Sequence, residues 1–340
     1  MNSKFKIFAL AIGLFCFSFQ ATASSILLPM DDEGQQNHLK AYGITYWALA
    51  KSYKVNWLLN YRGGSFLLPD GEDVRKECQI RGVSFEVLTD GATAAILEEI
   101  SSPSQNMETV VLEKAPKIAV YTPKGKQPWD DAVTMVLTYA EIPYTEIYDE
   151  EVLSDQLVLY EWLHLHHEDF TGQYGKFFGN YRNAPWYIQQ KLEAEALAKK
   201  LGFNKVSEEK RAVAIKIRDF VIGGGFMFAM CSATDSFDIA LSAESTDICE
   251  PMFDGDASDP NYQSKIDYTN TFAFKDYILE KQPMKYEFSD IDTTEEHGKG
   301  SFSMEVDYFT LMDFSAKWDP IPTMLCQNHT QIVKGFMGQT

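Results

Sequence analysis

Short apolar runs alternate with amphipathic stretches between about Lys117 and Ala243, and this alternation constrains the fold more than any other feature of the chain. We expect strands at 118–121, 144–148, 162–166 and 226–230, and helices at 133–140, 186–202, 208–222 and from 238. Apolar strands separated by helices pack as a parallel sheet with helices on both faces. The sequence therefore predicts an α/β domain with a doubly wound, flavodoxin-like parallel sheet.

The flanking regions are less regular. Residues 24–113 mix helical and extended patterns, which favours an N-terminal α/β subdomain or an extension of the main sheet. Residues 246–340 lose the periodicity and carry many acidic and aromatic side chains, so we expect an irregular excursion belonging to the same domain as 114–245. The sequence ends without a closing helix or strand, and we expect the natural chain to continue past Thr340.

The first 23 residues have the order of a secretory signal. Lys4 and Lys6 precede an apolar run at 7–19, and Ala21 and Ala23 favour cleavage before Ser24. The run is shorter than the ~20 apolar residues that cross a bilayer. We expect a periplasmic or secreted protein with no membrane span after cleavage.

The net charge limits the classes of binding partner, and the cysteine spacing limits the kinds of cysteine site. The formal net charge of −19 disfavours nucleic acid, whose phosphates bind lysine and arginine, and leaves a small-molecule or glycan partner. Cys78, Cys231, Cys249 and Cys326 remain after cleavage, and their spacing matches neither a zinc pattern nor a dense disulfide framework. We expect buried thiols or one disulfide for at least three of them.

Two polar segments follow predicted strands, at 166–169 and 231–236. Ligands of open parallel sheets bind at the carboxyl ends of strands. Cys231 stands where a strand turns into a helix, a position that exposes a nucleophile and favours its thiolate. The alternative is an ordinary buried cysteine. We expect Ser232, Ser236 and Asp235 to cap the helix.

The histidine-rich segment offers partners for that thiol. His166 or His167 would act as the base, oriented by Glu168 or Asp169. His329 is a second candidate base late in the chain.

Other polar groups could hold a metal. His164, His166 and Asp169 could bind a divalent ion, the one cofactor that the sequence leaves open. The alternative is a set of ordinary hydrogen-bonded histidines. The acidic segment 254–259 lacks the closing glutamate of a calcium loop, so we expect a solvated turn.

Segments 117–121, 162–169 and 218–231 occur in an order that resembles the class I glutamine-amidotransferase-like superfamily. The resemblance covers about the middle third of the chain. It implies a flavodoxin-like fold with Cys231 at the nucleophile position, and a histidine and glutamate from a later strand. The small residues that bracket the nucleophile in that superfamily are missing here.

Segments 37–43, 60–66, 164–172 and 230–241 are similar to a family of exported Bacteroidota proteins that often carry the name asparagine synthetase B. Synthesis of that type needs a cysteine at the mature N-terminus and a Ser-Gly-Gly-x-Asp-Ser loop. Here Ser24 would stand first, and segment 232–236 lacks the glycines. The resemblance therefore implies a shared fold, and the named activity is disfavoured.

Three functions remain open. The first is an amidotransferase-like hydrolase of amide, ester or sugar-derived substrates that uses Cys231. The second is a non-catalytic envelope module that binds a glycan or metabolite through Trp129, Tyr174 and Trp186. The third is a metal-dependent hydrolase built on the histidine-rich segment.

Overall fold

The computed structural model describes residues 23–123, 132–291, 335 and 337. The chain divides into two compact units, the first continuing to Ala115 and the second beginning at Pro116. The predicted signal segment, apart from Ala23, lies outside the described residues, as do Trp129, Cys326 and His329. Within the described part, no helix combines the length and apolar character needed to span a membrane.

The first unit contains a five-stranded antiparallel sheet with the strand order β4-β1-β3-β2-β5. Its elements are β1 (Ala23–Leu28), α2 (His38–Ala50), β2 (Val55–Leu59), β3 (Phe66–Pro69), α3 (Glu72–Arg81), β4 (Glu86–Thr89), α4 (Asp90–Ser101) and β5 (Glu108–Leu112). These strands form a sheet of their own and do not extend the parallel sheet.

Side chains alternate across this antiparallel sheet, so each strand contributes to two cores. Ile26 and Leu28 of β1 pack in a cluster with residues of α2 and α3. Leu27, between them, packs in a second cluster with Ile100 of α4. The first unit is therefore a sheet covered by helices on both faces.

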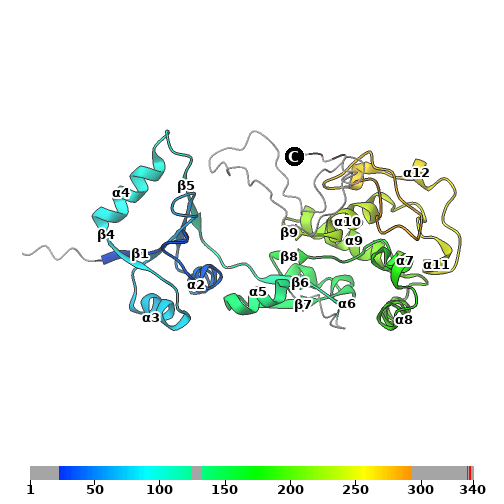
Figure 1. The fold of residues 1–340 in the computed structure, drawn as a ribbon, viewed down its shortest axis with the longest axis horizontal. Helices are drawn as coiled ribbons and strands as arrows, with labels where there is room; N and C mark the ends of the chain where they lie inside the picture. The colour runs from blue at the N-terminus through cyan, green and yellow to red at the C-terminus, as the bar shows by residue number, and fades with distance from the viewer. Residues whose placement is uncertain (1–22, 124–131, 292–334, 336, 338–340) are drawn as a thin grey trace, which may run out of the picture. The chain divides into compact units, whose positions relative to one another are not determined.

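The second unit contains a four-stranded parallel sheet (Figure 1) with the strand order β7-β6-β8-β9. This order confirms the predicted flavodoxin-like α/β fold. Its elements are β6 (Ile118–Tyr121), α5 (Ala132–Ala140), β7 (Tyr144–Ile147), α6 (Asp149–Leu153), η1 (Gln156–Leu159), β8 (Trp162–Leu165), η2 (Tyr174–Lys176), α7 (Phe178–Tyr181), α8 (Pro185–Lys200), α9 (Val206–Ile222), β9 (Phe226–Ala229), α10 (Ser232–Ser242), α11 (Pro251–Asp254), α12 (Tyr262–Lys265) and η3 (Tyr268–Asn270).

One face of the parallel sheet packs against α6, α9 and α10. Leu163 and Leu165 of β8 contribute to a core cluster with Val213 and Ile217 of α9 and Phe237 of α10. Right-handed crossovers that run in opposite directions along a sheet place their helices on opposite faces. The crossover through α5 runs opposite to those through α6 and α9, so α5 belongs to the other face.

Between α10 and Ile291, where the described stretch ends, the chain forms only short helices and one isolated bridge, as expected for an irregular excursion. Asp238 of α10 fixes it, because its buried carboxylate accepts the backbone N–H groups of Phe272, Ala273 and Phe274 at 2.8–2.9 Å. Tyr277 reinforces this attachment by donating to the Ser242 hydroxyl at 2.6 Å. The excursion is thereby part of the second unit.

Candidate functional site

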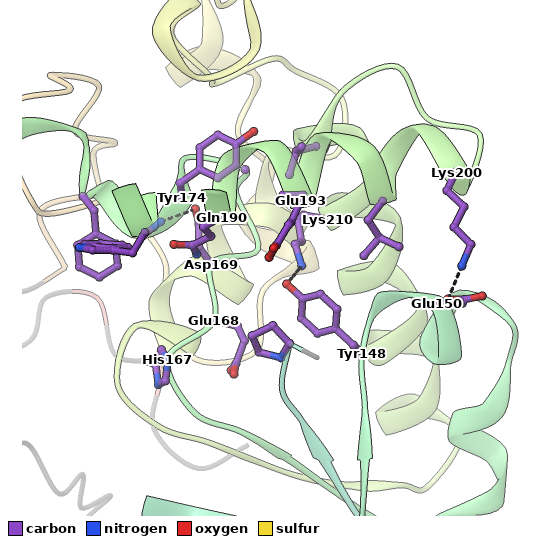
Figure 2. A pocket seen from close by; sticks show the side chains of 18 residues that line it. Tyr148, Glu150, His167, Glu168, Asp169, Tyr174, Gln190, Glu193, Lys200 and Lys210 are labelled. Atoms are coloured by element: carbon purple, nitrogen blue, oxygen red, sulfur yellow. Dashed lines mark hydrogen bonds and ion pairs between the residues drawn. The ribbon is translucent and has the colours of Figure 1, made fainter. Parts of the chain in front are cut away.

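A cavity of about 340 Å³ opens beyond the carboxyl ends of the parallel strands (Figure 2). The strand order reverses between β6 and β8, and open α/β sheets bind ligands at such a reversal. Pro123 follows β6, Tyr148 follows β7, and His167 follows β8. The remaining lining residues are Glu150, Glu168, Asp169, Gly172, Tyr174, Gly175, Phe177, Trp186, Gln190, Glu193, Ala194, Leu197, Lys200, Val206 and Lys210.

The loop after β8 is held by its own carboxylates. Glu168 accepts the backbone N–H of His166 at 2.9 Å. Asp169 accepts the N–H and hydroxyl of Thr171 at 2.7 and 2.6 Å, and the N–H of Gly175 at 3.0 Å. Both oxygens of Asp169 are therefore used inside the loop, where they shape the backbone and do not orient a histidine as proposed from the sequence.

The three histidines of this segment have different surroundings. His164 is buried, and its ring stacks on Phe228 with centroids 5.5 Å apart. Burial, with a smaller effect of His166, lowers the pKa of His164 to about 4, so it is neutral near pH 7. The rings of His166 and His167 lie 4.6 Å apart, and His167 lines the cavity.

The proposed metal ligands do not converge. His164, His166 and Asp169 are all described, yet their ligand atoms do not form a group of the kind that could hold an ion. Asp169 is occupied by its loop, and His164 is packed against Phe228. His164 is therefore a packed core histidine, and its buried Nε2 has no hydrogen-bond partner among the described residues.

Cys231 lies between β9 and α10 with φ 52° and ψ −140°. A positive φ is uncommon for a residue other than glycine, and such strain is concentrated at functional turns. The residue is exposed. Partial desolvation nevertheless raises the pKa of its thiol, while a hydrogen bond from the Ser232 backbone acts in the opposite direction. Cys231 is not among the residues that line the cavity.

The serines after Cys231 are not helix caps, which corrects the sequence prediction. The N-cap of α10 is Cys231 itself, with no side-chain capping bond. The Ser232 hydroxyl donates to the carbonyl of His167, and the buried Ser236 hydroxyl donates to that of Glu168, both at 2.8 Å. Asp235 accepts the N–H of the adjacent Ser236 at 2.8 Å. The serines thus fasten the β9 turn to the loop after β8.

Lys210 and Tyr148, which line the cavity, belong to an ionic group that sequence reasoning missed. The Lys210 ammonium donates to Asp149 at 2.6 Å and to the hydroxyls of Tyr121 and Tyr148 at 3.0 Å. Burial alone would lower the pKa of Lys210, but Asp149 holds it well above its usual value. Lys210 precedes Val213 and Ile217 by three and seven residues, so helical spacing already placed it on the apolar stripe of α9.

Glu209 lies beside this group and is 1% exposed. Burial raises its pKa to about 8, against the influence of Lys210. Its Oε1 has no hydrogen-bond partner among the described residues. Near pH 7 this side chain therefore tends to keep its proton.

The turn expected at 254–259 is exposed at 255–257, but Asp254 is an exception that belongs to a second cluster. Ligand atoms of Asp247, Cys249 and Asp254 all lie within 4.8 Å of one another, and the side chain of Asp254 is only 4% exposed. The Lys205 ammonium lies 2.8 Å from Asp247, 3.4 Å from Asp254 and 2.5 Å from Asp256. Lys205 therefore supplies the cation for these carboxylates, in a structural role.

No protein-family model, curated protein or solved structure matches the chain.

Proposed function

We propose that the second unit is a thiol-dependent hydrolase of amide, ester or sugar-derived substrates, with Cys231 as the nucleophile. The supporting observation is the backbone of Cys231, which combines φ 52° and ψ −140° at a turn from strand to helix. A nucleophile in a sharp strand-to-helix turn projects from the sheet edge and has the helix N-terminus behind it.

His167 is the base that fits this scheme best. It lines the cavity, and its carbonyl accepts the Ser232 hydroxyl, so the two strand ends are joined by a hydrogen bond. Glu168 also lines the cavity, and its negative charge contributes to raising the pKa of the Cys231 thiol. The scheme requires a substrate that is bound against the loop after β8 and reaches the thiol with its reactive carbon.

The chemistry follows the usual course for a thiol nucleophile. His167 takes the thiol proton, and the thiolate attacks the carbonyl carbon to form a thioester. The alcohol or amine leaves with the proton from His167. Water, deprotonated by the same imidazole, then releases the acid and restores the thiol.

The test is turnover of a panel of p-nitrophenyl esters and amides by the wild-type chain and by Cys231→Ala. We expect turnover to fall to background in the variant and iodoacetamide to modify Cys231 before the buried Cys78 and Cys249. A matched control is Cys78→Ala, which removes a thiol in the first unit. Undiminished turnover by Cys231→Ala would overturn the assignment.

A second candidate is a non-catalytic module that binds a glycan or metabolite. The observation that favours it is the cavity lining, which contains Tyr148, Tyr174, Phe177 and Trp186 but not Cys231. Aromatic faces bind the apolar faces of sugars. Ligand binding without thiol-dependent turnover on any substrate would favour this candidate.

For either function we propose that the chain acts outside the cytoplasm. The support is the signal-like order of its first 23 residues. Mass analysis of the protein recovered from the periplasm of an expressing bacterium should give a chain beginning at Ser24. Recovery of the uncleaved chain from the cytoplasm alone would contradict export.

A further inference from the structure

Both lysines among the described residues of the cavity lining already have carboxylate partners. Lys210 is 5% exposed and pairs with Asp149, which is 1% exposed. Lys200 pairs with Glu150 at 2.9 Å. A ligand phosphate or carboxylate would have to compete with these carboxylates for the lysines. Lys210 already donates to Asp149, Tyr121 and Tyr148, so an anion could bind it only by displacing one of them. Lys200 is more exposed, but its charge is already balanced by Glu150.

The other charges in the same lining are negative. It contains Glu168, Glu193, Asp169 and Glu150 against the two lysines. Like charges brought together in a partly desolvated cavity repel each other strongly. The described lining is therefore unfavourable for an anionic ligand.

Two neutral polar groups can bind a ligand. The Tyr148 oxygen accepts the Lys210 ammonium, which leaves its hydroxyl hydrogen without an acceptor among the described residues. Burial raises the pKa of Tyr148, so the phenol keeps this hydrogen. The amide of Gln190, half-buried on α8, has no hydrogen-bond partner in the described part of the chain. The cavity thus offers an O–H donor and an amide that can donate and accept.

Apolar surface supplies the remainder of the lining. Tyr174, Phe177 and Trp186 form one aromatic wall, in which Phe177 and Trp186 pack edge to face with centroids 5.5 Å apart. The volume of about 340 Å³ is near the lower end of the roughly 300–1,000 Å³ that ligand pockets occupy. Such a site fits a small ligand with both hydroxyl groups and an apolar face.

We propose that this cavity binds an uncharged, hydroxyl-rich ligand of one or two sugar units, with Tyr148 as a hydrogen-bond donor to it. The inference rests on the second candidate function, the binding module, and names the ligand class of its cavity. Tyr148 acts as a binding residue, and Lys210 fixes the orientation of its hydroxyl.

The test is calorimetry on the whole protein with glucose, galactose, N-acetylglucosamine, maltose and cellobiose. The matched anions are glucose 6-phosphate and glucuronate. At least one neutral sugar should bind, and the anions should bind at least about ten-fold more weakly because of the surrounding carboxylates. Stronger binding of either anion, or no heat from any neutral sugar at about 20 mM, would overturn the proposal.

The variant Tyr148→Phe isolates the donor. It keeps the ring over which Lys210 lies and should weaken sugar binding about three- to ten-fold, the usual effect of losing one neutral hydrogen bond. Tyr144→Phe, on β7 and outside the cavity lining, is the matched control and should leave affinity unchanged. Equal affinities for the two variants would contradict the role of Tyr148.

Binding and turnover can fail separately. Cys231→Ser should still bind the sugar, because the thiol does not line the cavity. If the protein binds a sugar but its turnover does not need Cys231, only the assignment of Cys231 as nucleophile is wrong. If turnover of another substrate needs the thiol but no sugar binds, only the proposed ligand class is wrong.

Discussion

The ends of β8 and β9 lie at the same edge of one sheet, yet they differ in almost every physical respect. After β8 the chain forms a loop whose carboxylates accept its own N–H groups, and the loop lines a cavity. After β9 the chain enters α10 at once, through the exposed and strained Cys231. The segment after each strand, and not the strand itself, decides what that end can do.

The same comparison separates binding from reactivity. The loop after β8 reaches the cavity that holds Lys210 and Tyr148, which suits recognition of a ligand. The turn after β9 offers an exposed thiol that does not line the cavity. Ser232 and Ser236 join the two by their bonds to His167 and Glu168. Substitutions can therefore alter the cavity beside the loop after β8, the turn after β9, or the serine hydrogen bonds that join them.

The largest effect is expected on the cavity side, from Lys210→Met. The substitution leaves Asp149 buried without its cation, and breaking a buried pair in this way costs about 3–5 kcal/mol. Urea unfolding should show the loss. The matched control on the same helix is Lys216→Met, whose pair with Asp155 is exposed and should contribute less than about 1 kcal/mol. Similar unfolding midpoints for the two variants would contradict the buried pair.

Glu209→Gln should change the pH dependence of stability. The folded-state pKa of Glu209 is about 8, above its usual 4.5, so between these values the folded chain holds a proton that the unfolded chain has lost. This group therefore lowers stability as pH rises from 4.5 to 8, by at most about 1.4 kcal/mol per pH unit. The variant should lose this contribution in urea unfolding measured across that range. Glu208→Gln should keep it, and an unchanged slope in Glu209→Gln would refute the raised pKa.

Ser236→Ala should weaken the connection between the two strand ends. It removes a buried hydroxyl that donates to Glu168 and accepts the N–H of Phe170. Leaving these groups without a partner should cost about 1–3 kcal/mol. Ser264→Ala, which removes an exposed hydroxyl bonded to Asn261, is the control and should have little effect on thermal unfolding. A neutral result for Ser236→Ala would mean that the connection contributes nothing to stability.

The smallest effect is expected at the thiol. Cys231→Gly should be more stable than Cys231→Ala by roughly 1 kcal/mol, because glycine adopts a positive φ without strain. At Ser232, inside α10, the order should reverse, because glycine destabilises helices relative to alanine. Thermal unfolding of the four variants measures both differences. The same order at both positions would show that the Cys231 turn is unstrained.

Much of the second unit could be predicted because its strands and helices are encoded locally. The strand at 118–121 has the expected bounds, and the other three expected strands each end one residue early. Helix α10 begins at Ser232, six residues before the expected start at Asp238, because the serines were assigned to a capping turn. In the first unit, α3 gives a weak local signal because it is charge-rich and buries only Val74 and Cys78.

The candidate site was predicted in part. The order of apolar runs predicts strand ends at His166 and near Cys231. It therefore also marks His167 and Glu168, which follow the first of these strands, as candidate site residues. The use of Asp169 inside its own loop depends on the backbone path after β8, to which Gly172 and Gly175 contribute with positive φ. Local patterns do not define such a path.

By itself, the sequence determined the succession of strands and helices, because 2-residue and 3.6-residue periodicities record which face of each element is buried. It also determined which polar side chains follow the strands. Only the tertiary structure decided that Lys210 meets Asp149, 61 residues earlier, and that the cavity is lined by the loop after β8 and not by Cys231. Those outcomes depend on how distant segments pack, and no local pattern encodes the distance between them.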